Sequence, residues 1–135
     1  MRALKTGGAL LVALGLLFVL LTVAALEGPE VVVLRTMDAH GKTRETRTWI
    51  ADYDGLSWVE AANPAREFYR QILENPEVEL LRGKERQRFR AVPLANPEGH
   101  VLIRRLLFEK YGLADRWIGL LADTSQSIAI RLDPR

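Results

Sequence analysis

The chain has 135 residues, enough for one domain, with 19 Lys and Arg residues, 17 Asp and Glu residues and no cysteine. The absence of cysteine excludes disulfides and thiolate metal sites. Arg2 and Lys5 precede an apolar run, so residues 27–135 carry 17 basic and 17 acidic side chains. A nucleic-acid-binding domain normally has a basic excess, so nucleic acid is not an expected partner.

Residues 6–26 form a run of 21 uncharged residues that is dense in Leu, Val and Ala. A helix of this length spans about 30 Å, the hydrocarbon thickness of a bilayer. A secretory signal peptide is the alternative, because Val23, Ala24 and Ala25 offer small residues near a possible cleavage point. The apolar core of a signal peptide is usually only about 7–15 residues long. We therefore expect an uncleaved transmembrane anchor over residues 1–26 and a separate domain over residues 27–135.

The charges on either side of the apolar run predict its orientation. Arg2 and Lys5 lie before it, and Glu27 and Glu30 follow it. The positive-inside rule then places the N-terminus in the cytoplasm and the domain outside, with a single pass through the membrane.

The first half of the domain has the pattern of three strands and a helix. Residues 31–37 are typical of a buried strand, and residues 42–52 of its return strand. Asp54 and Gly55 predict a tight hairpin, because this pair tolerates positive φ angles. Asn63 and Pro64 then predict a helix over residues 64–74, with Asn63 as its cap and Pro64 in its first turn. Such a helix start beside a hairpin suits an anion.

The second half of the domain is expected to contain three further strands and two helices. Strands are expected over residues 78–81 and 85–94, helices over residues 97–111 and 113–122, and a last strand over residues 127–132. The basic residues at positions 82, 84, 86, 88 and 90 would share one face of an unbroken strand. A solvated face that prevents edge-to-edge pairing is favoured there over an anion or membrane surface. Six short strands with few helices predict a mainly β protein with flanking helices (α+β) and favour a small β-barrel. The hydrophobic alternation does not distinguish a barrel from a sandwich.

The residue patterns give little support to several kinds of chemistry. No nucleophile elbow, phosphate-binding glycine loop or paired histidine spacing is present in the sequence, so no catalytic residue and no metal ligand is assigned. Aromatic side chains do lie beside basic ones, for example Trp49 beside Arg47 and Tyr69 beside Arg70. Planar cofactors stack on aromatic walls, and Arg or Lys holds their phosphates.

The order of these patterns resembles the deazaflavin-dependent nitroreductase and quinone reductase family, a branch of the flavin-binding split β-barrels. The resemblance covers nearly all of residues 31–134. It is carried by Leu34-Arg35-Thr36, Gly41-Lys42-Thr43-Arg44, Asp54-Gly55, Trp58-Val59-Glu60-Ala61-Ala62-Asn63, Phe68-Tyr69, Leu73-Glu74-Asn75-Pro76-Glu77-Val78-Glu79-Leu80 and Glu109-Lys110-Tyr111-Gly112.

The resemblance implies a split β-barrel that binds a deazaflavin or FMN, and a homodimer. It places the cofactor phosphate at Lys42 and Arg44, and the ring system along Ala61, Ala62 and Asn63 beside Tyr69. Tyr111 would border the acceptor pocket. In two places the chain departs from the family pattern. Asp38 and Ala39 replace a basic pair, and the loop before the first domain helix is short.

Two functions follow from these observations. The first is a membrane-anchored oxidoreductase that passes hydride from a reduced deazaflavin or flavin to a lipophilic, quinone-like acceptor. The second is a non-catalytic membrane-tethered barrel that binds a ligand or a protein partner. The predicted orientation favours the second function, because deazaflavins are reduced by cytoplasmic enzymes.

Overall fold

The computed structural model describes residues 2–27 and 30–135, and its domain is a closed antiparallel barrel of six strands. The strand order around the barrel is β1-β2-β3-β6-β5-β4, and pairing between β1 and β4 closes it. This confirms the predicted barrel with flanking helices. The elements are α1 (Arg2–Glu27), β1 (Val31–Met37), β2 (Thr43–Tyr53), β3 (Leu56–Ala61), α2 (Glu67–Glu74), β4 (Glu77–Arg82), β5 (Glu85–Pro93), α3 (Glu98–Tyr111), α4 (Leu113–Leu121) and β6 (Ile128–Pro134).

The barrel interior forms the main hydrophobic core. Each strand contributes alternate residues to it, as Val32 and Leu34 do from β1. α2 adds Phe68 and Ile72 to the same core, so it packs against the barrel interior. A buried hydrogen bond from Thr36 Oγ1 on β1 to Gln71 Oε1 on α2, 2.5 Å long, holds this helix in place.

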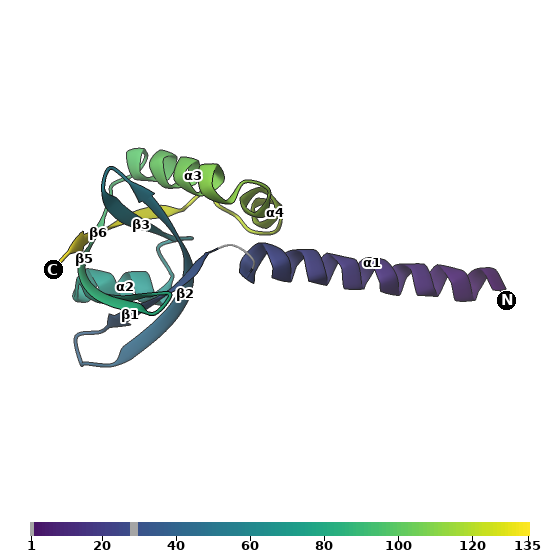
Figure 1. Cartoon of the computed structure of the whole chain (residues 1–135), viewed down its shortest axis with the longest axis horizontal. Coiled ribbons are helices and arrows are strands. Elements are labelled where there is room, and N and C mark those ends of the chain that lie inside the picture. Colours follow the sequence, from purple (N-terminus) through teal and green to yellow (C-terminus); the bar gives the residue numbers. More distant parts are fainter. Residues whose placement is uncertain (1, 28–29) are drawn as a thin grey trace.

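A second core lies between the outside of the barrel and α3 (Figure 1). Ile103 and Leu107 of α3 pack there against Ala51, Trp58 and Ala129 of three strands. Strands β2, β3 and β6 therefore bury side chains on both faces. This explains why neither face of β2 has a clean polar pattern in the sequence.

The hairpin at Asp54 and Gly55 is confirmed, with φ angles of 54° and 75°. The predicted start of α2 at Pro64 is wrong, because the helix begins at Glu67. Asn63 Oδ1 instead accepts a hydrogen bond from the N–H of Ala65, 2.9 Å away, and closes a turn before the helix. Asn63 therefore shapes the turn and does not cap the helix.

The basic residues from 82 to 90 do not all lie on one face, because the chain reverses at Gly83. Arg86, Arg88 and Arg90 are exposed on β5, as a solvated face requires. Arg82 ends β4 and makes ion pairs with Glu30 and Asp52, both at 2.8 Å.

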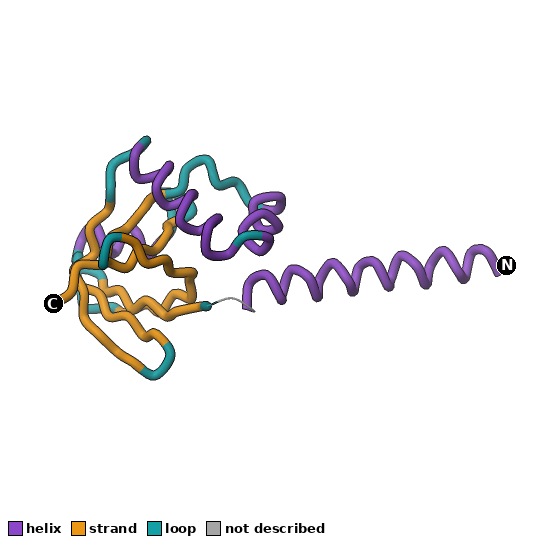
Figure 2. Tube along the Cα trace, turned by 45° about the horizontal axis from the view of Figure 1, so that its top comes forward, coloured by secondary structure: helices purple, strands orange, loops and turns teal. Residues whose placement is uncertain are grey.

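α1 extends away from the barrel as a long separate helix, as Figures 1 and 2 both show. Residues Lys5–Leu26 are long and apolar enough to cross a membrane, and only 6% of this segment is buried. Length and composition allow a membrane span or a signal sequence. α4 is the element of the domain that packs against α1.

Candidate functional site

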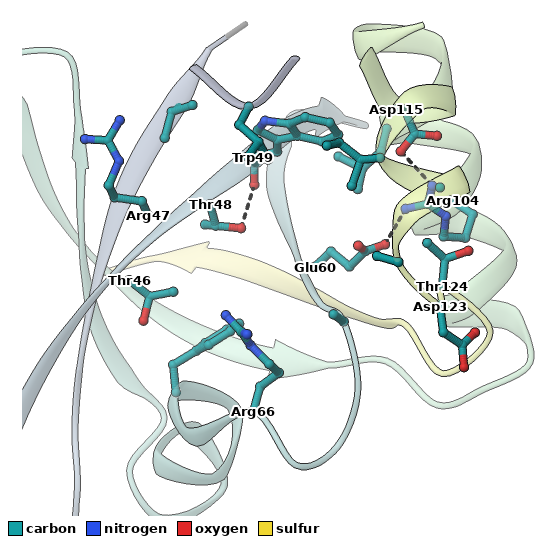
Figure 3. A pocket seen from close by; sticks show the side chains of 18 residues that line it. Thr46, Arg47, Thr48, Trp49, Glu60, Arg66, Arg104, Asp115, Asp123 and Thr124 are labelled. Carbon is teal, nitrogen blue, oxygen red and sulfur yellow. Dashed lines mark hydrogen bonds and ion pairs between the residues drawn. The ribbon is translucent and has the colours of Figure 1, made fainter. Parts of the chain in front are cut away.

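A cavity of about 390 Å³ lies where the barrel, α4 and the end of α1 meet (Figure 3). This volume lies within the range of small-molecule and cofactor sites. β2 and the loop after β3 form one side of the cavity, while α4 and the segment that follows it form the other. The wall includes Leu26 of α1, Trp49 of β2, Ala62, Phe68 of α2 and Ile118 of α4.

β2 contributes both of its faces to this cavity, because the cavity lies at the rim of the barrel. Thr46 and Thr48 are half-buried and share the face of β2 on which Ile50 enters the barrel core. Trp49 lies on the opposite face and stacks on Tyr111, with ring centroids 4.3 Å apart and planes 14° apart. The Trp49 ring is thus a rigid aromatic wall.

Arg104 of α3 makes the main polar contacts of the cavity wall. Its guanidinium is 2.7 Å from Glu60 of β3 and 2.6 Å from Asp115 of α4, and these three side chains are largely buried. Burial alone would lower the pKa of Arg104, but the hydrogen bonds to Glu60 and Asp115 raise that pKa above its usual value. The ion pairs join three elements, and the single cation compensates part of the charge of the two carboxylates.

A second hollow, lined by Arg44, adjoins the cavity. The two spaces share Thr46, Arg66 and Phe68 in their walls. Arg66 points into the larger cavity from the segment before α2 (Figure 3), and it makes no ion pair in the part of the chain that the structure describes. Arg44 makes an ion pair with Glu67 in the first turn of α2. The larger hollow therefore has an aromatic wall at Trp49, and the smaller one brings Arg44 and Arg66 together.

The predicted cofactor residues fall into two groups around this space. Ala62 lines the larger cavity, and Arg44 lines the second hollow. Lys42 is exposed beside the turn before β2, where Asp38 Oδ1 accepts hydrogen bonds from the N–H groups of His40 and Lys42 at 2.9 Å. Asp38, which replaces a basic residue of the family pattern, therefore shapes the β1–β2 turn.

The other predicted residues contact the barrel more than the cavity. Ala61 is fully buried in the barrel core, backbone included, and its contact with a cofactor stays a prediction. Asn63 is half-buried in the turn before α2, and Tyr69 packs against the core with part of its ring exposed. Ala62 and Arg44 line two adjoining hollows, Asn63 lines neither of them, and the role of these residues in binding stays a prediction.

Tyr111, the predicted substrate-pocket residue, lies behind Trp49 and outside the cavity wall. Its hydroxyl accepts a hydrogen bond from the N–H of Ile50 at 3.0 Å, and it can donate to the carbonyl of Glu30 at 2.8 Å. Burial raises the pKa of Tyr111 to about 12. In this position Tyr111 supports the Trp49 wall, and contact with a substrate stays a prediction.

Several cavity residues were not found from the sequence, including Glu60, Arg66, Arg104 and Asp115. Glu60 and Ala62 are adjacent along the chain, but Arg104 and Asp115 come from helices more than 40 residues later. No short motif joins these positions, so only the tertiary structure brings them together. In the described ranges, no group of three or more His, Asp or Glu side chains is placed to hold a metal ion.

Comparisons with known proteins give the fold a wider context. The sequence matches no protein-family profile and no curated protein. Solved structures with the same fold include the heme storage protein HutZ from Vibrio cholerae, with 17% identity and a TM-score of 0.61 over 82% of this chain and 85% of that one. A putative pyridoxamine 5'-phosphate oxidase from Listeria innocua has 14% identity and a TM-score of 0.59 over 84% and 90%.

An F420-H2 dependent reductase is also similar, with 19% identity and a TM-score of 0.57 over 76% of this chain and 93% of that one. The chain therefore has the same fold as these three proteins. Identities this low show a common fold and leave activity to be argued from the site.

Proposed function

We propose that this chain is a membrane-anchored oxidoreductase of the deazaflavin-dependent nitroreductase and quinone reductase type. It binds a deazaflavin or FMN and passes hydride to a lipophilic acceptor. The observation that carries the proposal is a pair of adjoining hollows beside β2. Trp49 lines the larger hollow, Arg44 lines the smaller one, and Arg66 and Phe68 lie in the wall that both share. A flavin-type cofactor has the matching chemistry, a planar ring joined to a phosphate.

The residues in this space fit such a cofactor. Ala62 has a small side chain that leaves its backbone accessible beside a flat ring. Arg66 and Arg44 are within the second hollow and suit a phosphate, although Glu67 now neutralises Arg44. Lys42 is exposed on the same hairpin. When bound, the cofactor supplies the hydride, while the protein orients the acceptor and excludes water.

The end of α1 gives the reason to expect a lipophilic acceptor. Leu26 of α1 and Ile118 of α4 line the same cavity as Trp49. With α1 in a bilayer, this side of the cavity faces the membrane surface, where quinone-like molecules dissolve. Carbonate washing of membranes tests the anchor. The full-length chain is expected to stay in the membrane fraction, and its release would contradict anchoring.

Cofactor titration of the full-length protein in a mild detergent tests the site. FMN and a deazaflavin are each added and followed by fluorescence. Arg66→Ala and Arg44→Ala are expected to weaken binding about tenfold to a hundredfold, the value of one charge-assisted contact to phosphate. Arg88→Ala is the matched control, because Arg88 is exposed on β5 away from the space. If the three variants lose cofactor affinity equally, the binding site lies elsewhere in the protein.

A non-catalytic tethered barrel is the second candidate function, and the charge balance of the wall favours it. Arg44 is neutralised by Glu67, and Arg104 faces two carboxylates, Glu60 and Asp115. These groups leave no positive charge for a phosphate, so a ligand without a phosphate fits beside them. The same titration separates the candidates. If the wild type binds neither cofactor at tens of micromolar, the enzyme proposal fails and this function replaces it.

A homodimer is part of the proposal. One solved structure with the same fold, at 17% identity and a TM-score of 0.59, is described as a domain-swapped dimer. Light scattering of the purified chain, corrected for bound detergent, is expected to give twice the mass of one chain. A mass of one chain at all concentrations would contradict pairing.

A further inference from the structure

α4 exposes a stripe of large apolar side chains that no other described element covers. Leu113 and Leu120 are each 81% exposed, and Leu121 is 49% exposed. With Trp117 they follow the spacing i, i+4, i+7 and i+8, which places all four on one face of the helix. The opposite face carries Asp115, which is buried and bound to Arg104 at 2.6 Å. This ion pair fixes the rotation of α4, so the leucine stripe points away from the barrel.

The stripe lies beside the last turns of α1. Trp117 Nε1 donates a hydrogen bond to Thr22 Oγ1 at 3.0 Å, and the Trp117 ring lies 5.6 Å from the ring of Phe18. The apolar segment of α1 ends at Leu26. At 1.5 Å per residue, Thr22 lies about 6 Å and Phe18 about 12 Å before that end. Trp117 is thus level with a part of α1 about 6–12 Å inside the end of its apolar segment, close to the depth of about 5–10 Å at which interfacial helices bury their apolar face.

The direction of α4 fits this depth. Figure 1 shows α1 leaving the domain lengthwise, while α4 is seen nearly end-on beside the end of α1. α4 therefore crosses the direction of α1. A helix that crosses a transmembrane helix lies along the plane of the membrane, as interfacial amphipathic helices do. Arg116 is exposed next to the stripe, where its long side chain can reach the headgroups.

We infer that α4 is an interfacial membrane helix, with Leu113, Trp117, Leu120 and Leu121 inserted into the bilayer leaflet from which α1 emerges. The inference rests on the proposed membrane anchoring by α1. It assigns lipid as the partner of this face, because the contacts to Phe18 and Thr22 hold the stripe at the depth of lipid. A Trp at this level matches the aromatic belt of membrane proteins. The membrane then holds the domain at two points, and the side of the cavity lined by Ile118 stays at the bilayer surface.

Spin labelling of the full-length chain in phospholipid vesicles tests the inference. The chain has no cysteine, so single substitutions can be labelled cleanly. Leu113→Cys and Leu120→Cys are the test positions. Leu14→Cys, 53% exposed in α1, is the lipid control, and Leu73→Cys, 61% exposed on α2, is the water control. Collisions with oxygen, which dissolves in lipid, are compared with collisions with a nickel chelate, which stays in water.

At positions 113 and 120, oxygen collisions are expected to exceed nickel collisions, as at position 14, and the ratio is expected to reverse at position 73. If position 14 behaves as lipid-exposed while positions 113 and 120 resemble position 73, the inference about α4 is overturned and the anchor stands. If position 14 also contacts the nickel chelate, the anchor itself fails. Low collision with both reagents at positions 113 and 120 would show a protein partner on this face and would also overturn the inference.

Discussion

Arg104 is the residue on which the cavity wall depends most. It is the one cation that both Glu60 of β3 and Asp115 of α4 contact in the described part of the chain. Because Asp115 is buried, its charge has little access to water once Arg104 is lost. A buried carboxylate without a cation is much less stable than the intact pair.

Arg104→Met is therefore expected to lower the free energy of unfolding by about 3–5 kcal/mol. Urea unfolding of the full chain in a mild detergent measures this. Arg105→Met is the matched control on the same helix, because Arg105 is exposed and lies 3.9 Å from Glu109. It is expected to change the free energy by less than about 0.5 kcal/mol. Similar losses for the two variants would show that the Arg104 ion pairs do not support the fold.

Asp52 gives a prediction about acid stability. Its hydrogen bond to Arg82 lowers the pKa of Asp52 from the ordinary 3.8 to about 2. The folded state thus favours the carboxylate, so the stabilisation is complete above about pH 4 and is lost as the pH falls towards 2. The Asp52 side chain is 54% exposed, which limits the effect to about 0.5–1 kcal/mol.

Urea unfolding between pH 2 and pH 6 checks this expectation. Asp52→Asn is expected to flatten the loss of stability between pH 4 and pH 2. Asp54→Asn, at the neighbouring hairpin turn, is expected to keep the wild-type profile because Asp54 has no ion pair among the described residues. An unchanged profile for Asp52→Asn would mean that the pair with Arg82 contributes no stability.

α2 is joined to the barrel by one buried polar contact. Thr36→Val removes the hydroxyl that donates a hydrogen bond to Gln71 Oε1. The buried Gln71 amide is then left without this partner. The substitution is expected to lower the free energy of unfolding by about 1–3 kcal/mol. Adding Gln71→Leu is expected to recover part of the loss, because an apolar pair needs no hydrogen bond. Urea unfolding of Thr36→Val, Gln71→Leu and the double variant gives the coupling free energy between the two residues. If the losses of unfolding free energy in the two single variants simply add in the double variant, the two side chains are not coupled.

At the scale of elements, the sequence predicts local structure well where the conformation depends on one pair of residues. Asp54 and Gly55 are enough to predict the hairpin, because few other pairs of residues can both adopt a positive φ angle. Asn63 and Pro64 were misleading, because an Asn side chain can close a turn as well as cap a helix. The sequence pattern alone does not separate these two hydrogen-bonding roles.

At the scale of the whole molecule, the number and spacing of the strands predict a mainly β fold, and the family resemblance adds the barrel, but neither predicts the cavity. Pairing of β3 and β5 with β6 joins segments far apart in the chain. The site depends on that pairing, since α4 and Asp115 reach Glu60 only when the barrel has closed. The family resemblance placed Arg44 and Ala62 at one space, and nothing in it indicated Arg104 or the end of α1.

The orientation of the whole chain remains a prediction with a direct test. In intact spheroplasts that contain the full chain, a membrane-impermeant maleimide is expected to label Leu73→Cys, because the domain lies outside. Leu14→Cys in α1 is the control and is expected to stay unlabelled. Labelling of position 73 only after lysis would place the domain in the cytoplasm, where reduced deazaflavin is available, and would favour the enzyme over the tethered barrel.

β6 is the last of the six strands to leave the ribosome, yet it lies between β3 and β5 in the barrel. Until residues 128–134 emerge, both of those strands have an open edge, and α3 lacks the surface that Ala129 provides. The apolar segment of α1, in contrast, emerges first and needs no later residue to enter a translocon. A chain anchored by α1 is therefore tethered before its barrel can close. For a chain anchored in this way, the edges of β3 and β5 stay open at the membrane until β6 emerges, and open strand edges can pair with those of neighbouring chains.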